Sequence, residues 1–212
     1  MNSATLSLEG SAAAAEDRAL APLPIIFVRH GETDWNRAAR LQGQRDIPLN
    51  ALGRRQAARN GRALAGLLAA SPWSAVASPL QRATETMEIV RIAAGQPHLP
   101  FRTDPLLREL SYGDWEGLTL PELAIRDPDG ARGREADKWG YVPPAGESYE
   151  VAARRVVTWL GTLLGPTLVV AHGGILRILL HHFAGQPSHD APHLAAPQDR
   201  VVLFTRVAVY TI

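Results

Sequence analysis

Two histidines in this 212-residue sequence stand where they could do chemistry. His30 comes directly after Arg29, at the end of the apolar run 25–28. His172 ends a second apolar run, 168–171, and is followed by two glycines. An unprotonated imidazole nitrogen can act as a nucleophile, and a neighbouring arginine can bind an anion through two hydrogen bonds. The pattern indicates nucleophilic chemistry on an anionic substrate.

A third strand end adds a second arginine. The apolar run 75–77 leads into Ser78 and Pro79, and Arg82 follows. Serine is a favoured N-cap residue and proline a favoured first helical residue, so we expect Arg82 in the first turn of a helix that Ser78 caps. Open α/β sheets bind ligands at the carboxyl ends of their strands. We therefore expect both histidines and both arginines to converge on one site.

Hydrophobic periodicity predicts the elements that position these residues. Helices are predicted over 50–70, 79–94, 119–127, 147–164 and 175–183, and strands over 25–28, 75–78, 101–103 and 167–171. The valine-rich end, 200–212, predicts one long strand or two. Because strands alternate with helices, the chain predicts an α/β fold with a parallel sheet and helices on both faces.

Two long segments lack a clear period. Residues 32–50 are polar and irregular, and a loop of this length inside a compact domain is usually functional. Residues 127–146 are charged and include Trp139 and Tyr141. This second segment is predicted to be a loop that either is simply solvated or closes over the site as a lid.

Five short motifs occur in order along the chain. They are Arg29-His30-Gly31-Glu32-Thr33 with Asn36, Gln42-Gly43, Ser78-Pro79-Leu80-Gln81-Arg82-Ala83, Glu109-Leu110-Ser111-Tyr112-Gly113 and Ala171-His172-Gly173-Gly174. Over roughly residues 25–184 they resemble the histidine phosphatase superfamily, also called the phosphoglycerate mutase-like family. The resemblance implies a three-layer α/β/α sandwich with a mostly parallel central sheet.

The resemblance also implies a role for each matching residue. His30 matches the histidine that becomes phosphorylated, His172 the second histidine that contacts the phosphoryl group, and Glu109 the proton donor. The remaining matches would bind phosphate or the rest of the substrate: Arg29, Arg82, Asn36, Gln42, Gly43, Tyr112 and Gly173. Independently of the family, nearby arginines disfavour the imidazolium and so help to keep His30 neutral.

We therefore predict a phosphomonoester hydrolase that acts on small phosphorylated metabolites through a phosphohistidine. A cofactor-dependent phosphoglycerate mutase is the alternative. Family mutases carry a lysine after the Tyr-Gly segment and an Arg-Arg pair, whereas here residues 114–117 read Asp-Trp-Glu-Gly, and Arg132 is separated from Arg134. Residues 141–144 resemble the mutase turn, which keeps that alternative open. A non-catalytic phosphate-binding module is more remote, because binding alone needs no nucleophile paired with an acid.

A metallohydrolase using His30, His172 and Glu109 is disfavoured. Ligand spacings such as His-Glu-x-x-His are absent, and two arginines would lie beside the metal cation. The other histidines of the C-terminal region are expected at the surface: His181, His182, His189 and His193. We expect no metal and no other cofactor.

Composition limits the remaining classes. The net charge of +1 points to neither nucleic acid nor an anionic membrane, no apolar stretch is long enough to span a bilayer, and the absence of cysteine excludes disulfides and thiol catalysis. Residues 1–24 are expected to be a loosely attached tail without a secretory signal, and 25–212 a single domain. The sequence predicts a cytoplasmic enzyme whose partner is a small phosphorylated substrate, and it leaves a homodimer open.

Overall fold

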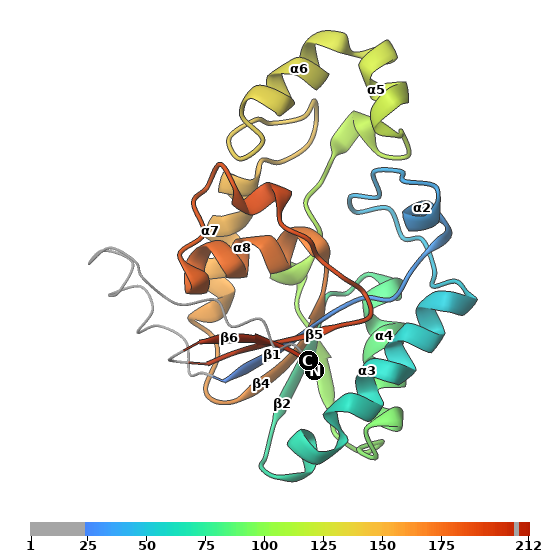
Figure 1. Ribbon diagram of the computed structural model, residues 1–212, viewed down its shortest axis with the longest axis vertical. Coiled ribbons are helices and arrows are strands. Elements are labelled where there is room, and N and C mark those ends of the chain that lie inside the picture. Colours follow the sequence, from blue (N-terminus) through green and yellow to red (C-terminus); the bar gives the residue numbers. More distant parts are fainter. Residues whose placement is uncertain (1–23, 206–207) are drawn as a thin grey trace.

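One six-stranded sheet runs through the molecule (Figure 1). The computed structural model describes residues 24–205 and 208–212, so the predicted tail lies outside the described residues except for Pro24. In spatial order the strands are β3 (Phe101–Thr103), β2 (Ser74–Ala77), β4 (Thr167–Ala171), β1 (Ile25–Arg29), β5 (Val201–Phe204) and β6 (Val209–Thr211). The first four are parallel to one another, whereas β5 and β6 pair antiparallel at one edge. The predicted mostly parallel α/β fold is confirmed.

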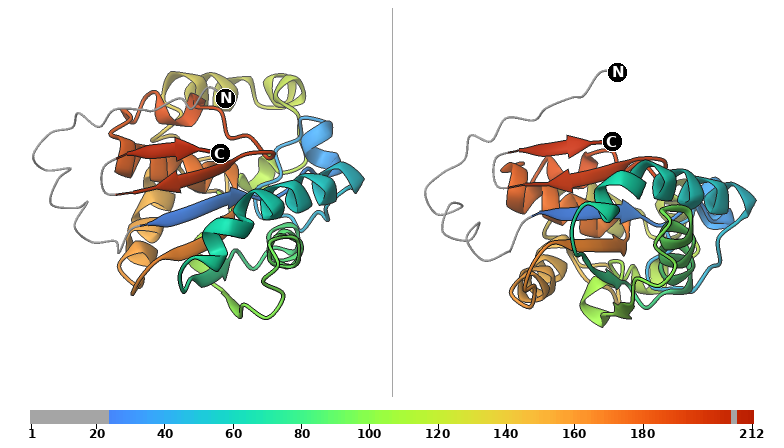
Figure 2. Two further views of the ribbon diagram at one scale, coloured as in Figure 1. Left: turned by 60° about the horizontal axis from the view of Figure 1, so that its bottom comes forward. Right: turned by 90° about the horizontal axis from the view of Figure 1, so that it is seen from below.

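The valine-rich end forms two strands rather than one long strand. β5 runs antiparallel to β1, and β6 runs antiparallel to β5. Figure 2 shows the two red arrows pointing in opposite directions, with one of them beside the blue β1. The two antiparallel strands therefore extend the sheet at its β1 edge, and the parallel strands carry the candidate residues.

Backbone pairing brings the three strand ends to the same level. The backbone N–H of His30 donates to the carbonyl oxygen of Ala171 at 2.9 Å, and that of Ser78 donates to the carbonyl oxygen of Val170, also at 2.9 Å. β4 thus lies between the other two strands and holds both in register. The expected convergence of the three junctions at one sheet edge is what the strand pairing produces.

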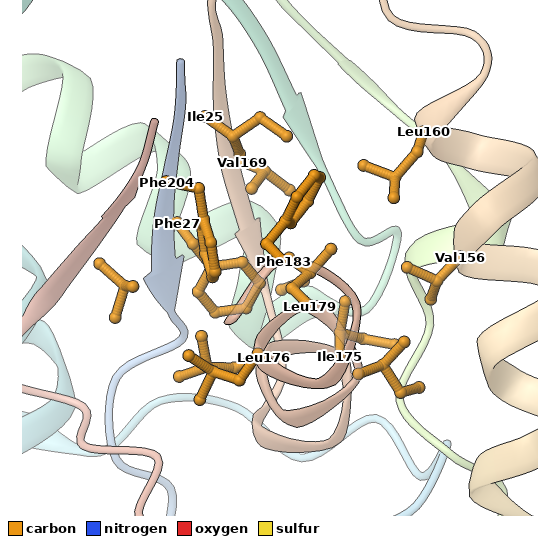
Figure 3. Packing of buried hydrophobic residues seen from close by; sticks show 14 of the residues in the cluster. Ile25, Phe27, Val156, Leu160, Val169, Ile175, Leu176, Leu179, Phe183 and Phe204 are labelled. Atoms are coloured by element: carbon orange, nitrogen blue, oxygen red, sulfur yellow. The ribbon is translucent and has the colours of Figure 1, made fainter. Parts of the chain in front are cut away.

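Helices cover both faces of the sheet (Figure 1). α3 (Ala51–Ala69) and α4 (Gln81–Ala93) lie on one face, and α7 (Tyr149–Leu160) and α8 (Gly173–Ala184) lie on the other. Alternate residues of β1 point to opposite faces, so Ile25 and Phe27 pack with α7 and α8 (Figure 3), while Ile26 and Val28 pack with α3 and α4. The three-layer sandwich is confirmed, and the unbroken apolar run of β1 is explained by burial on both sides.

The start of α4 differs from the prediction. Ser78 does not cap the helix: α4 begins at Gln81, and its N-cap residue, Leu80, makes no side-chain capping bond. Instead, the Asp46 carboxylate accepts a hydrogen bond from the backbone N–H of Gln81 at 2.7 Å. Arg82 still lies in the first turn, as expected. The carboxylate of Asp46, from a distant loop, thus binds the first turn of α4 in place of the Ser78 hydroxyl, which lies 2.7 Å from His172 Nε2.

The prediction of a loop over 127–146 is wrong in its first half. α5 (Leu120–Arg126) is followed directly by α6 (Pro128–Ala136), and Asp127 caps α6 by accepting from the backbone N–H of Gly130 at 2.9 Å. Asp127 and the proline after it end α5 and also begin α6, since aspartate is a favoured N-cap residue and proline a favoured first helical residue. α6 buries only Gly130, so its sequence has no helical pattern of apolar residues from which it could be predicted. α5 and α6 project at the top of Figure 1.

The remaining elements are short. α2 (Asp34–Arg37) interrupts the segment predicted as irregular, and three 3-10 turns follow later: η2 (Pro105–Leu107), η3 (Gly113–Trp115) and η4 (Ala191–His193). Between residues 24 and 212, with 206–207 left aside, no helix has both the length and the apolar character that a bilayer crossing needs.

The prediction that the C-terminal histidines lie at the surface is only half right. His189 and His193 are exposed, but His181 and His182 are partly buried. His181 Nδ1 lies 2.6 Å from the Gln186 carbonyl oxygen, and its ring packs 4.6 Å from the Trp139 ring. Both residues belong to α8, and the packing of this helix against its neighbours partly buries them.

Candidate active site

A pocket of about 120 Å³ lies at the carboxyl edge of the parallel strands. The predicted site residues that line it are Arg29, His30, Asn36, Gln42, Gly43, Arg82, Glu109, Tyr112 and Gly173, and Arg40, Leu41 and Arg177 complete the wall. The remaining predicted residue, His172, lies next to the pocket, with its ring centroid 5.1 Å from that of His30. The structure therefore brings together all of the predicted site residues.

The His30 imidazole is buried and held in one orientation by a backbone carbonyl. Its Nδ1 lies 2.7 Å from the carbonyl oxygen of Gly31, so Nδ1 carries the proton and the lone pair is left on Nε2. Burial lowers the pKa of His30 well below its usual 6.5, and the positive charges of Arg82 and Arg29 lower it further. The imidazole is consequently neutral near pH 7.

Gly31 holds this turn against α3. A Cβ on Gly31 would lie 2.2 Å from the carbonyl oxygen of Gly53, which is backbone and cannot move aside. The backbone N–H of Gly31 donates to Thr86 Oγ1 at 3.1 Å. The glycine after the catalytic candidate is therefore needed for close backbone approach, and this contact fixes the carbonyl that orients the His30 ring.

His172 lies beside His30 with its ring tilted by 59°. Its Nε2 is 2.7 Å from Ser78 Oγ, and its Nδ1 has no hydrogen-bond partner among the described residues. Burial lowers the pKa of His172 well below 6.5, with further contributions from Arg82 and His30. Ser78, which the sequence marked as a helix cap, is thus a hydrogen-bond partner of the second histidine.

Two arginines lie near the histidines, Arg82 buried and Arg29 partly buried, and neither forms a salt bridge with a carboxylate of the described residues. Arg82 donates to the carbonyl oxygens of Gly43 (2.8 Å) and Arg45 (2.6 Å), and Arg29 donates to that of Ala196. In each of the two, Nε is buried and makes no hydrogen bond within the described chain. Burial lowers the pKa of Arg29 to about 10, so this side chain is still a cation at neutral pH. Such uncompensated charge favours an anionic ligand.

The amide side chains are oriented by hydrogen bonds outside the pocket. Asn36 Oδ1 accepts from the backbone N–H of Thr33 (3.1 Å) and from Gln198 Nε2 (3.0 Å), which leaves the Asn36 NH₂ group to donate to a ligand. Gln42 Oε1 likewise accepts from Thr33 Oγ1 at 2.9 Å. Gly43 has φ +51°, and a Cβ there would lie 2.0 Å from Glu116 Oε1. This turn therefore requires glycine on both conformational and steric grounds.

Glu109 lies at the amino end of α8. Both of its carboxylate oxygens accept from the backbone N–H of Gly174 at 3.2 Å, and Oε1 also accepts from that of Leu110 at 3.0 Å. A Cβ on Gly174 would lie 2.4 Å from Glu109 Oε1. The glycine that makes room for the carboxylate is thus Gly174, whereas Gly173, which the sequence marked as a substrate contact, lines the pocket.

A bidentate ion pair holds the backbone that carries Glu109. Arg155 binds the Glu147 carboxylate through Nη2 (2.7 Å) and Nε (3.2 Å), and it also donates to the carbonyl oxygens of Leu106 (2.5 Å) and Glu109 (3.3 Å). Glu147 Oε1 in turn accepts from the backbone N–H of Ser111 at 3.1 Å. Both charged side chains are less than one-fifth exposed, which makes this pair more rigid than an ordinary surface pair.

Sequence reasoning missed Arg40, Leu41 and Arg177 in the pocket wall, and it missed Gln198 and the pairing of Ser78 with His172. Arg177 is four residues after Gly173 on α8, so helical spacing places it on the same side as the pocket glycine. That signal was available in the sequence. Gln198 belongs to a segment without any motif, and only the tertiary structure reveals it.

The described residues contain no group of three or more His, Cys, Asp and Glu side chains that could hold a metal ion. His30 and His172 instead share their surroundings with Arg29 and Arg82, as the electrostatic effects on both rings show. Metal independence remains a prediction, which activity in the presence of a chelator would check.

The two buried histidines should make stability fall in mild acid. Their pKa in the unfolded chain is about 6.5 and in the folded chain well below it, so below pH 6.5 the unfolded state binds more protons. Stability from their neutral burial is complete above pH 6.5 and is lost as pH falls, by about 1.4 kcal/mol per pH unit for each histidine.

Urea unfolding at several pH values between 5 and 7 measures this slope. His172→Gln should reduce the slope by about 1.4 kcal/mol per pH unit, because one of the two buried titrating groups is removed. His193→Gln, at an exposed position, is the matched control and should reproduce the wild-type slope. An unchanged slope in His172→Gln would show that His172 is not held neutral by burial.

Comparison with known proteins gives the same assignment as the motifs. Residues 25–206 match the family model described as histidine phosphatase superfamily (branch 1). A glucosyl-3-phosphoglycerate phosphatase from Mycolicibacterium vanbaalenii is 34% identical over 80% of this chain and 78% of its own. A 2,3-bisphosphoglycerate-dependent phosphoglycerate mutase from Gloeobacter violaceus is 32% identical over 74% of this chain and 73% of its own.

A solved structure agrees with the sequence relatives. The α-ribazole phosphatase from Shigella flexneri superposes with a TM-score of 0.74 at 26% identity, covering 88% of this chain and 96% of that one. The predicted family, and the prediction of a phosphatase-type hydrolase, are confirmed by these relatives, among which the mutase alternative is also represented. This chain belongs to the histidine phosphatase superfamily, branch 1.

Proposed function

We propose that the protein hydrolyses small phosphomonoesters by way of a phosphohistidine on His30. The observation that carries the proposal is the buried, neutral imidazole of His30, whose Nδ1 is bound to the Gly31 carbonyl oxygen and which lines a pocket together with Arg29 and Arg82. Arg29 and Arg82 supply positive charge for a phosphate dianion, and the Asn36 amide supplies a further donor.

In the first step, Nε2 of His30 attacks phosphorus, an N–P bond forms and the bond from phosphorus to the ester oxygen breaks. The leaving alkoxide takes a proton from Glu109. This carboxyl must therefore be protonated when the substrate is bound, and a dianionic phosphate beside it favours that state. Glu109 lines the pocket with His30, which supports this role.

In the second step, Glu109 accepts a proton from water as the water oxygen attacks phosphorus. The N–P bond breaks, the electron pair returns to Nε2 of His30, and inorganic phosphate leaves. The products are one alcohol and one phosphate for each ester and water consumed. His172 lies beside the imidazole that gains and loses the phosphoryl group, in position to contact it in both steps.

The mutase alternative is favoured by one observation. The Arg134 guanidinium lies 6.0 Å from the centre of the Tyr112 ring. Lys138 lies close enough to Arg134 to be affected by its charge, since burial and then Arg134 lower the pKa of Lys138 to about 8. These cations lie beside the pocket, where a mutase needs positive charge for a second phosphate. Arg132, by contrast, is exposed and paired with Asp129.

A single assay separates phosphatase from mutase. Purified protein is supplied with 3-phosphoglycerate, with and without 2,3-bisphosphoglycerate, and both free phosphate and 2-phosphoglycerate are followed. We expect net phosphate release that does not depend on the bisphosphate, because only one arginine of the α6 pair faces the site. Rapid bisphosphate-dependent isomerisation with negligible phosphate release would contradict the proposal and favour the mutase.

The small substrate is the expected partner, rather than nucleic acid or a membrane surface, because the net charge is only +1 and the cations of the site are buried in a small pocket. A cytoplasmic location belongs to the same proposal, since charged phosphorylated metabolites are retained in that compartment. A homodimer stays an open alternative.

A further inference from the structure

Arg177 is a pocket residue that the phosphohydrolase mechanism does not use. It lies on α8, one helical turn after Gly173, and lines the same pocket as His30 and Glu109. Its Nε donates to the Leu194 carbonyl oxygen at 2.8 Å, and its Nη1 donates to the Tyr149 hydroxyl at 3.4 Å. Nη2 makes no hydrogen bond within the described chain, so one edge of the guanidinium remains available to a ligand.

The positive charge of Arg177 has no counter-ion within the described chain. No carboxylate lies within salt-bridge distance, and its protein partners are a carbonyl and a phenol. Burial, and then Tyr112, raise the pKa of Tyr149 above its usual 10, so this hydroxyl is not an anion at neutral pH. Burial lowers the pKa of Arg177, but Tyr149, Tyr112 and Glu109 outweigh burial and raise it overall. A partly buried, permanent cation therefore faces the pocket.

The position of Arg177 is close to the phosphate-binding arginines but not equivalent to them. A Cβ on Gly173 would lie 3.4 Å from Arg29 Nε and 3.5 Å from Arg177 Nη1, so the two guanidinium groups flank this glycine. Arg29 is anchored towards Ala196, whereas Arg177 is anchored towards Tyr149. A ligand only a few atoms long can contact both.

We infer that Arg177 binds a carboxylate carried by the substrate a few atoms from its phosphoester, which makes phosphorylated hydroxy acids the substrate class. This inference rests on the proposed phosphatase function. A carboxylate fits because one unpaired cation is matched by one negative charge and because a free guanidinium edge suits a carboxylate oxygen. The pocket, about 120 Å³, has room for one phosphoryl group and a short chain.

Two esters that differ only at the inferred contact test the assignment. 3-Phosphoglycerate carries a carboxylate where glycerol 3-phosphate carries a CH₂OH group, and the phosphoester ends are the same. For the wild-type protein we expect kcat/KM to be about 10- to 100-fold higher with 3-phosphoglycerate, the value of one charge-assisted hydrogen bond. Arg177→Met should bring the ratio of the two kcat/KM values close to one, because it should lower kcat/KM for 3-phosphoglycerate and leave that for glycerol 3-phosphate unchanged.

Three further measurements make the result specific. Arg177→Lys keeps the charge and should restore part of the preference, and Tyr149→Phe, which removes the hydroxyl that holds Arg177, should weaken it. Arg154→Met removes the same charge from an exposed site on α7 and should leave the ratio unchanged. Thermal unfolding of each variant shows whether it is folded. If Arg177→Met does not fold, the ratio of the two kcat/KM values in the wild-type protein still tests the inference.

The outcomes separate the inference from the proposed function. If the wild-type protein releases phosphate from both esters without preference, or if Arg177→Met lowers both values equally, Arg177 does not recognise a carboxylate, and the phosphatase proposal stands. If neither ester, nor 4-nitrophenyl phosphate, yields phosphate, the proposed function itself is wrong. An intact preference in folded Arg177→Met would also overturn the inference.

Discussion

His30→Ala should lower phosphate release by at least about 10⁴-fold, the largest effect expected from any single substitution in this protein. Without the imidazole no N–P bond can form, and the arginines and Glu109 can only bind and polarise the ester. The measurement is steady-state phosphate release from 4-nitrophenyl phosphate, with the variant's fold checked by circular dichroism. His193→Ala, which removes an exposed histidine, is the matched control and should retain wild-type activity.

The same pair of variants tests the covalent intermediate directly. Rapid quenching of the wild-type protein with ³²P-labelled substrate should trap a phosphoprotein that is labile in acid and stable in base, as a phosphohistidine is. His193→Ala should trap the same label, and His30→Ala should trap none. Accumulation of an equal amount of label in His30→Ala would assign the nucleophile to another residue, for which His172 is the neighbouring candidate.

The sequence was informative about this site because its main residues lie at strand ends. A buried parallel strand is recognisable from its unbroken apolar run, and the residue after the run must lie at the sheet edge. His30, His172 and Arg82 could be assigned to one edge on that basis before any contact was known. The strand pairing only had to fix which strands are neighbours.

The errors arose where a local signal competes with a distant group. Ser78 is a good cap by its type, but Asp46 takes that role for α4, and the serine hydroxyl binds His172 instead. Gly173 and Gly174 are indistinguishable in sequence. The stricter steric requirement at Gly174 comes from the side chains of Leu110 and Glu109, and Glu109 is 65 residues away along the chain. Such choices depend on tertiary contacts that no spacing rule contains.

α6 was missed for a different reason. Periodicity detects helices that bury an apolar side, and α6 buries only Gly130. The sequence does contain a signal for the start of α6, because Asp127 is followed by a proline. The same two residues also end α5, so the prediction assigned them to the end of that helix alone. A short polar helix is thus predictable from its cap and not from its pattern.

The cations of the site and its neutral histidines depend on one another. Burial without a carboxylate partner is unfavourable for Arg29 and Arg82, and carbonyl oxygens compensate only in part. The same charges, added to burial, hold His30 and His172 unprotonated. A bound phosphate dianion relieves the repulsion between the arginines at the moment when the neutral imidazole is needed. Anion binding and nucleophile activation are therefore properties of one electrostatic arrangement.

Glu109→Gln should have the second-largest effect, and its size should depend on the leaving group. Glutamine keeps the shape of the side chain but cannot donate a proton to an alkoxide. For an alkyl ester such as glycerol 3-phosphate, kcat/KM should fall by about 10²- to 10⁴-fold, the usual contribution of a general acid. For 2,4-dinitrophenyl phosphate, whose leaving group needs no proton, the fall should be less than about 10-fold.

The comparison must be made on kcat/KM, because this parameter covers only the steps up to transfer of the phosphoryl group to His30. The later attack of water also uses Glu109, as a base, so kcat would fall for every ester and would not isolate proton donation. Glu88→Gln, at an exposed position on α4, is the matched control and should behave as the wild type. Glu109 also accepts hydrogen bonds from Gly174 and Leu110, so a purely structural carboxylate is a real alternative. An equal loss of kcat/KM across all leaving groups would establish that structural role and exclude Glu109 as the acid.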